Sequence, residues 1–121
     1  MAKDGKPYKK LFAWQAGYKF TIDTYRFTED FPKHELYGVV SQLRRAAISV
    51  LANIVEGQAK PTTKDFLRYL YIAKASLAEC EFFLELSKDL GYLNEETYST
   101  LESSRGQTSF LLNRLIGSLT S

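Results

Sequence analysis

An apolar stripe with the period of an α-helix runs from residue 66 to residue 84. Successive members are separated by alternating steps of four and three residues, which is the spacing of a seam in a left-handed helix bundle. A helix with such a stripe needs other helices to cover it, so the stripe predicts an all-α protein. Its members are Phe66, Leu70, Ala73, Leu77, Cys80 and Leu84.

Short groups of breaker residues divide the rest of the chain into segments of helical length. Glycine, proline and asparagine interrupt the apolar pattern three times, and a basic leader, residues 1–7, precedes the first helix. Gly57 and Gly91 stand where helix C-terminal glycines belong, and Thr62 or Thr63 and Asn94 stand where N-caps belong. We predict one domain, residues 1–121, with a flexible leader and helices at about 8–30, 35–57, 63–90 and 94–119.

Composition is that of a globular protein with one core. Hydrophobic residues make up 45% of the chain and charged residues 25%, which disfavours a disordered or fibrous protein. The single cysteine, Cys80, cannot form an internal disulfide, and we expect it to be a buried small hydrophobe. No apolar run reaches the roughly 18 residues that span a bilayer, and no signal-type segment opens the chain. We therefore expect a cytoplasmic protein with no membrane partner.

The first helical segment is apolar on two sides. One face carries Leu11, Trp14, Tyr18, Ile22 and Tyr25, and a roughly opposite face carries Phe12, Ala16, Phe20 and Phe27. One face can serve the core of the bundle. The other needs a second partner, because aromatic stripes of this length form large apolar patches on a monomer. Another copy of the chain is the simplest partner, so we expect a homo-oligomer.

The second helical segment has a charged pair, Arg44 and Arg45, in a nearly continuous apolar run. A helical projection separates the two arginines. Arg45 belongs to a narrow polar strip with Gln42, Ser49, Asn53 and Glu56, whereas Arg44 projects among apolar residues. The strip is either the solvated edge of a helix buried on two sides or a surface that contacts phosphate or a partner protein.

Glu79 in the third segment resembles Arg44, because it is also a charged residue that projects among apolar residues of its helix. A partly buried arginine is usually paired with a carboxylate through its planar guanidinium. We hypothesise a structural pair between Arg44 and Glu79, within a subunit or across an interface. The alternative is that one or both side chains extend to solvent at the edge of a groove.

Positive charge is unevenly distributed along the chain. Residues 1–60 hold ten Lys/Arg and six Asp/Glu, whereas residues 61–121 hold six Lys/Arg and eight Asp/Glu, and the net charge is +2. Such a balance is weak for a small monomeric nucleic-acid binder, so a binding patch would have to arise from geometry or oligomerisation. The candidate nucleic-acid contacts are Lys19, Arg26, Arg45, Lys60, Lys64 and Arg68, to which the leader lysines Lys3, Lys6, Lys9 and Lys10 could add.

Residue patterns for catalysis are missing from the sequence. His34 is the only histidine, and no cysteine pair, glycine-rich phosphate loop or nucleophile elbow is present. The carboxylates Glu79, Glu81 and Glu85 are typical of a solvated helix surface. We expect no enzyme, no cofactor and no metal.

Residues 31–57 and 64–84 together resemble the four-helix-bundle proteins encoded by intervening sequences of bacterial large-subunit ribosomal RNA genes. The resemblance rests on an extended set of positions: Phe31-Pro32, Glu35, Tyr37-Gly38, Gln42, Arg44-Arg45-Ala46, Ser49, Asn53-Ile54, Glu56-Gly57, Phe66, Leu70, Ile72-Ala73, Ser76 and Glu79. It implies an antiparallel up-down bundle that assembles into a ring-like homopentamer around a central channel. A related family, the accessory variability proteins of diversity-generating retroelements, binds nucleic acid and a reverse transcriptase.

Two functions follow as hypotheses. The first is a non-enzymatic, homo-oligomeric bundle that binds structured RNA or other nucleic acid through basic residues, in association with a reverse transcriptase or a ribosomal component. The second is a protein-interaction or structural adaptor that binds no nucleic acid. Steep salt dependence of RNA binding distinguishes the first from the second, because phosphate contacts release counterions.

Overall fold

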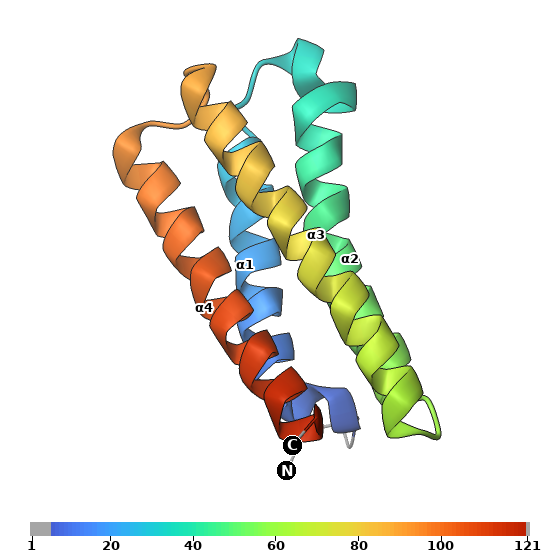
Figure 1. Cartoon of the computed structure of the whole chain (residues 1–121). Coiled ribbons are helices and arrows are strands. Elements are labelled where there is room, and N and C mark those ends of the chain that lie inside the picture. Colours follow the sequence, from blue (N-terminus) through green and yellow to red (C-terminus); the bar gives the residue numbers. More distant parts are fainter. Residues whose placement is uncertain (1–5, 121) are drawn as a thin grey trace.

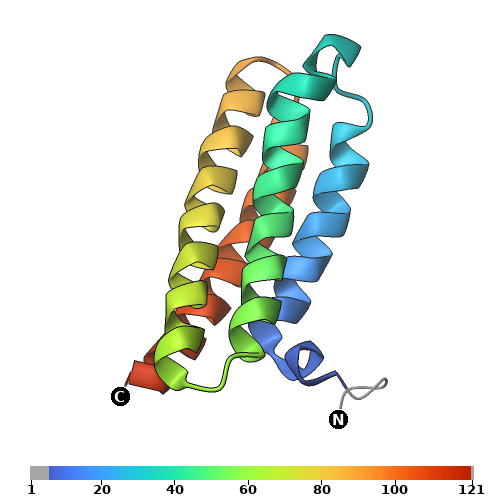
Figure 2. The same cartoon turned by 90° about the vertical axis from the view of Figure 1, so that its right-hand side faces the viewer.

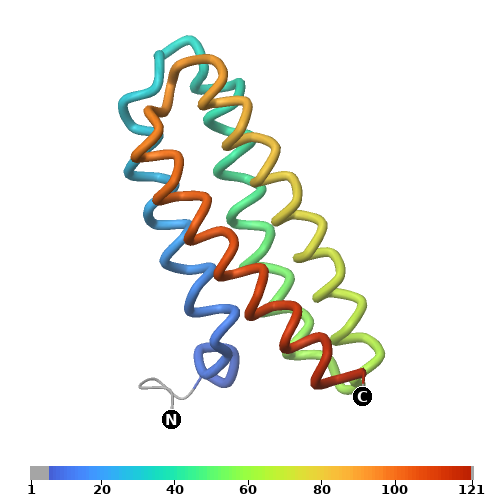
Figure 3. Tube along the Cα trace, turned by 60° about the vertical axis from the view of Figure 1, so that its left-hand side comes forward, coloured from blue at the N-terminus to red at the C-terminus, as the bar shows by residue number. Residues whose placement is uncertain are grey.

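Four long helices form an up-down antiparallel bundle in the computed structural model, which describes residues 6–120. They are α1 (Phe12–Thr28), α2 (Ser41–Gln58), α3 (Thr63–Asp89) and α4 (Glu95–Thr120). Each helix packs against the next one in the chain, and α4 returns alongside α1 (Figures 1 and 3). No strand occurs in residues 6–120. The predicted all-α bundle is confirmed.

Short irregular helices precede α1 and α2. A 3-10 helix, η1 (Pro7–Lys10), comes before the extended residue Leu11, so that α1 begins at Phe12 rather than near residue 8. A 3-10 turn, η2 (Lys33–Glu35), and a π-turn, η3 (Leu36–Val40), come before α2, and the backbone is kinked at Gly38. Residues 1–5 of the predicted leader lie outside the described residues.

The ends of α3 and α4 follow the cap signals of the sequence. Thr62 caps α3, since its hydroxyl accepts a hydrogen bond from the Asp65 amide at 3.2 Å. Asn94 caps α4 in the same way, by accepting from the Thr97 amide at 2.8 Å. Gly91 ends the α3 region with a φ of 83°, a left-handed conformation that glycine adopts without a steric penalty.

The predicted stripe on α3 forms the centre of the bundle. Leu70, Ala73, Leu77, Cys80 and Leu84 are all fully buried, and Phe66 at the end of the stripe is partly buried. The buried residues of α4 are Leu101, Arg105, Thr108, Leu112 and Ile116. Burial raises the pKa of the Cys80 thiol to about 12, so this cysteine is a protonated core residue.

Small and hydroxyl-bearing residues, not aromatic ones, form most of the inner face of α1. The buried residues of this helix are Ala13, Gly17, Phe20, Thr21, Thr24 and Thr28. Three of its threonine hydroxyls donate to carbonyls one turn earlier, which satisfies them inside the bundle. A Cβ on Gly17 would lie 3.2 Å from Leu51 Cδ2 and 3.4 Å from Thr108 Cγ2, so neighbouring helices leave little room there.

The prediction that one apolar face of the first helix serves the core holds for Leu11 and Trp14, which pack against the core, and the other face contributes only Phe20 as a buried aromatic residue. Phe12 is 70% exposed, Phe27 is also exposed, and Tyr18, Ile22 and Tyr25 remain exposed on the opposite side. Both apolar faces of α1 flank the inner face instead of forming it. The single chain thus leaves more apolar surface uncovered than the sequence pattern suggests.

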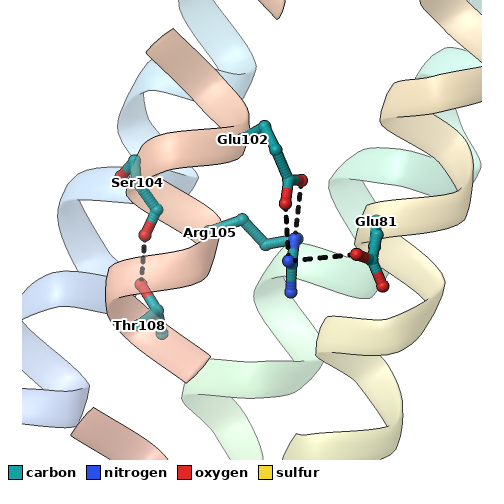
Figure 4. Close-up of polar contacts among 5 residues, drawn as sticks. All are labelled: Glu81, Glu102, Ser104, Arg105 and Thr108. Carbon is teal, nitrogen blue, oxygen red and sulfur yellow. Dashed lines mark hydrogen bonds and ion pairs between the residues drawn. The ribbon is translucent and has the colours of Figure 1, made fainter. Parts of the chain in front are cut away.

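One buried charge, Arg105, is neutralised inside the α3/α4 contact. This residue is 9% exposed, and Figure 4 shows its guanidinium between Glu102 of the same helix and Glu81 of α3. Nε and Nη2 donate to the two oxygens of Glu102 at 2.8 and 2.6 Å, and Nη2 also reaches Glu81 at 3.3 Å. The hydrogen bonds with Glu102 raise the pKa of Arg105, so the guanidinium stays charged and paired.

Gly57 lies inside α2 and sets how closely α2 approaches α3. The helix continues to Gln58, so the expectation of a C-terminal glycine at this position is wrong. A Cβ on Gly57 would lie 2.8 Å from Tyr69 Cβ and 2.9 Å from Phe66 Cδ1. The absence of a side chain therefore lets the end of α2 pack directly on α3 (Figure 2).

Replacing Gly57 with alanine is expected to destabilise the bundle by about 1–3 kcal/mol, because the new methyl group overlaps α3 and the helices must separate. Urea unfolding followed by circular dichroism measures this change. Gly106→Ala is the matched control, since nothing lies within 4 Å of a Cβ at that helical position. There, helix propensity is expected to stabilise the protein by up to about 1 kcal/mol. Equal effects at both glycines would contradict the close-approach explanation.

Candidate nucleic-acid interface

The six predicted basic contacts fall into three separate places. Lys60, Lys64 and Arg68 lie at the α2–α3 connection, and Arg26 and Arg45 lie in the half of the bundle nearer the α1–α2 connection. Lys19 lies between these places and forms an ion pair with Asp23 at 2.9 Å. The structure therefore brings three of the six together, and a role in nucleic-acid binding stays a prediction for all six.

Cations from remote parts of the sequence join these three residues. The beginning of α1, the end of α2, the beginning of α3 and the end of α4 meet at one end of the bundle (Figures 1 and 2). This end comprises residues 6–13, 56–70 and 111–120, with seven Lys/Arg and two Asp/Glu. We call it the basic end. Its cations are Lys6, Lys9, Lys10, Lys60, Lys64, Arg68 and Arg114.

Arg114 is the cation of the basic end that sequence reasoning missed. It belongs to the last helix, far along the chain from the other cations, and no local pattern marks it. In the structure it lines a depression of about 330 Å³ together with Lys10, Leu11 and Phe12. The signal that could have revealed it is the topology, because antiparallel packing of α4 on α1 brings the end of α4 beside the segment that precedes α1.

Tyr69 organises the basic end around an aromatic ring. The Lys60 ammonium lies 5.2 Å from the centroid of this ring, and the Arg68 guanidinium carbon lies 4.6 Å from it. Both separations are those of cation–π contacts. Arg68 is also 3.9 Å from Asp65, an exposed pair that adds little stability. Gly57 lets α2 end against this ring, so Lys60 reaches it from the connection.

The opposite end of the bundle is acidic. Residues 23–38 and 85–97, which meet there, hold eight Asp/Glu and three Lys/Arg. The bundle therefore carries opposite charge at its two ends, a distribution that the small net charge of the chain conceals. A polyanion would be attracted to the basic end and repelled by the acidic one.

Glu35 links two segments at the acidic end. One carboxylate oxygen accepts a hydrogen bond from the Tyr92 hydroxyl at 2.7 Å, and the other accepts from the Val39 amide at 3.4 Å. The bond from Tyr92, followed by that from Val39, lowers the pKa of Glu35. A side chain at Gly38 would collide with this carboxylate, which explains a glycine at the kink before α2. Glu35 thereby joins the segment before α2 to Tyr92 in the connection between α3 and α4.

Arg44 contacts α1 instead of Glu79 within the subunit. Its Nε donates to the Thr28 hydroxyl at 2.9 Å, its Nη2 donates to the Tyr25 carbonyl at 3.3 Å, and its guanidinium carbon lies 4.5 Å from the Tyr25 ring centroid. The intramolecular form of the predicted Arg44–Glu79 pair is therefore wrong. The physical reason is that carbonyls at the end of α1 carry partial negative charge and accept from a cation. Pairing across an interface stays a prediction.

The predicted polar strip of α2 lies beside α3. The Ser49 and Ser76 hydroxyls share a hydrogen bond of 2.8 Å, and the Asn53 amide donates to the Ser49 carbonyl at 2.8 Å. These two strip residues thus bind within the bundle, whereas Gln42, Arg45 and Glu56 are exposed. Part of the strip therefore belongs to the contact between α2 and α3, and the rest lies on the exposed surface of α2.

Between residues 6 and 120, no group of three or more His, Cys, Asp or Glu side chains could hold a metal ion. Over the same residues, no helix is both long enough and apolar enough to cross a membrane.

Replacing Glu35 with glutamine tests the link at the acidic end. Because the pKa of Glu35 is lower in the folded protein, its ionised form stabilises the fold above the unfolded pKa of about 4.3, and this contribution is lost as the pH falls through the folded pKa. The stability difference between wild type and Glu35→Gln should therefore be larger at about pH 7 than at about pH 2.5. Thermal unfolding across this range measures it, with Glu29→Gln as an exposed control. A difference that does not change with pH would refute the assignment.

Comparison with known proteins identifies the family. Residues 9–114 match the family described as "23S rRNA-intervening sequence protein". A crystal structure from Bacteroides thetaiotaomicron, described as a protein with unknown function from the S23 ribosomal protein family, superposes with a TM-score of 0.77 at 24% identity. The alignment covers 86% of this chain and 97% of that chain, and it supports the fold. A search of curated proteins finds no match. The chain belongs to the 23S rRNA-intervening sequence protein family.

Proposed function

We propose that this protein is a non-enzymatic, homo-oligomeric bundle that binds structured RNA or other nucleic acid through its basic end. The observation that carries the proposal is the gathering of seven Lys/Arg and two Asp/Glu where four helix ends meet. Phosphate contacts dominate nucleic-acid affinity, and they need cations that are close together more than they need a large net charge. The basic end supplies such a group.

Oligomerisation would strengthen this surface. The exposed apolar residues on both sides of α1 support association with further copies of the chain. In a closed ring whose symmetry axis is parallel to the bundle axes, equivalent ends of all bundles face the same side. The basic ends would then form one continuous positive surface, and the acidic ends would form a negative surface opposite to it. The number five and the cytoplasmic location remain expectations from the resemblance and the sequence.

The family description supports RNA of ribosomal origin as the first ligand to test. A ribosomal component or a reverse transcriptase would then be an associated partner rather than a requirement for RNA contact. The competing function is an adaptor that uses its surfaces only for protein contacts. The two functions differ in whether purified protein binds RNA in the absence of other proteins.

Measuring RNA affinity against salt concentration tests the proposal. The probe is a fluorescein-labelled hairpin from 23S ribosomal RNA, and anisotropy is recorded from about 50 to 200 mM salt. The double variant Lys60→Gln/Lys64→Gln should bind at least about tenfold more weakly at low salt, and the slope of log K against log salt should fall by roughly two. The matched control, Lys19→Gln/Arg26→Gln, removes the same charge away from the basic end.

Two results would contradict the proposal. Absence of any RNA binding by wild type at low salt would favour the adaptor function. An equal loss of affinity in the two double variants would mean that the RNA does not contact the basic end specifically. Circular dichroism of both variants checks that the helices are retained, because Lys60 also contacts the Tyr69 ring.

A further inference from the structure

We propose that the exposed face around Arg44 receives the outer face of α3 from a second copy of the chain, with Glu79 of that copy paired to Arg44. The proposal rests on the homo-oligomer of the proposed function and names the contact that would build it. It does not depend on RNA binding, so the two can fail separately.

The receiving face consists of two adjoining depressions; the larger is lined by two guanidinium groups and no carboxylate, and the smaller is also lined by Glu29 and Lys33. A depression of about 440 Å³ lies between α1, η3 and α2, and a neighbouring one of about 290 Å³ shares Leu36, Val40 and Arg44 with it. Tyr37, at the kink before α2, is 90% exposed at its edge. The residues that line the larger depression are Tyr25, Leu36, Tyr37, Val40, Ser41, Arg44, Arg45 and Ile48.

Arg44 is held in place by uncharged acceptors. Its hydrogen bonds go to a hydroxyl and a backbone carbonyl, and the Tyr25 ring lies against its guanidinium. A guanidinium has five N–H donors, and the hydrogen bonds seen in residues 6–120 use two of them. The group is thus oriented by its own subunit but receives no carboxylate there. A carboxylate from outside the subunit would supply the charged partner that such an arginine usually has.

The surroundings of Arg44 favour a protein carboxylate over a phosphate. Apolar and aromatic side chains make up most of the lining, and the depression lies in the half of the bundle nearer the acidic end. A nucleic acid would approach that half against repulsion. A carboxylate carried on an apolar surface would instead bury Ile48, Leu36 and Tyr37 as it pairs with Arg44. The expected ligand is therefore an acidic residue flanked by apolar ones.

The outer face of α3 has this composition. Ile72 and Phe82 are large exposed hydrophobic residues, 41% and 59% accessible, and Glu79 is exposed between them. Spacings of seven and three residues place the three on one side of the helix. The stripe from residue 72 to residue 82 is roughly 15 Å long, at 1.5 Å per residue. Ala75 and Leu86 project onto the same side, so Glu79 is the single charge of an apolar face.

The two faces lie on different sides of the same bundle, one across α1 and α2 and the other on α3 (Figure 2). Each copy can therefore receive α3 from one neighbour and offer its own α3 to another. A contact of this kind is heterologous, and it closes into a ring when the rotation per copy divides a full turn. The proposed ion pair would then repeat once at every subunit boundary.

Charge reversal at the two positions tests the contact. Arg44→Glu and Glu79→Arg should each weaken self-association at least about tenfold, because each variant places like charges opposite one another. Light scattering coupled to size-exclusion chromatography measures the mass against the 13.8 kDa monomer. Mixing the two variants should raise the mass above that of either variant alone, since a boundary between unlike variants pairs complementary charges. A ring with an even number of copies can alternate fully, whereas a ring of five keeps one like-charge boundary. Rescue on mixing is the result that an intramolecular pair could not produce.

Controls separate this contact from folding and from RNA binding. Glu85→Arg makes the same charge change on α3 at a position about 120° around the helix from Glu79, and it should leave the mass unchanged. Glu79→Arg disturbs no contact of Arg44 with α1, so it remains informative if Arg44→Glu unfolds the protein. A monomeric wild type, or both variants retaining the wild-type mass, would overturn the proposal. Arg44→Glu that keeps its mass but loses RNA affinity would overturn it in favour of a phosphate site.

Discussion

The close packing of α2 on α3 is the constraint on which the other features of the bundle depend. Gly57 removes the side chain at the tightest point, and the Ser49–Ser76 hydrogen bond joins the two helices farther along. This contact places Tyr69 beneath the α2–α3 connection, where Lys60 and Arg68 lie against its ring. It also turns the stripe of α3 toward the core, so that Ile72, Glu79 and Phe82 are left outside.

Antiparallel topology converts a weak charge imbalance into two charged ends. The difference between the halves of the sequence is modest, yet each end of the bundle collects the termini of four helices. One end gathers the cations of residues 6–10, of the α2–α3 connection and of the end of α4. The opposite end gathers the carboxylates of the α1–α2 and α3–α4 connections. A surface suited to polyanions thereby arises in a protein with a net charge of +2.

The two neighbouring arginines of α2 show which side-chain environments a helical projection can predict and which it cannot. Projection separates Arg44 from Arg45 correctly, because one residue step rotates the side chain by about 100°. It does not reveal that the apolar sector around Arg44 faces the end of α1, where the Tyr25 carbonyl and the Thr28 hydroxyl accept its hydrogen bonds. Projection also overestimates aromatic burial in α1, because the space available between helices, not hydrophobicity, selects Gly17 and the threonines for the inside.

Sequence by itself determined the helical class, the four segments, the caps at Thr62 and Asn94, and the core stripe of α3, because these depend on local periodicity and local hydrogen bonding. Only the tertiary structure decided which face of α1 is inside, that Gly57 serves a helix contact, and that Arg114 joins Lys10 and Lys60 at one end. Those outcomes depend on distances between helices that are remote in sequence. The pattern of residues along the sequence carries no information about these distances, because they are set only when the helices pack against one another.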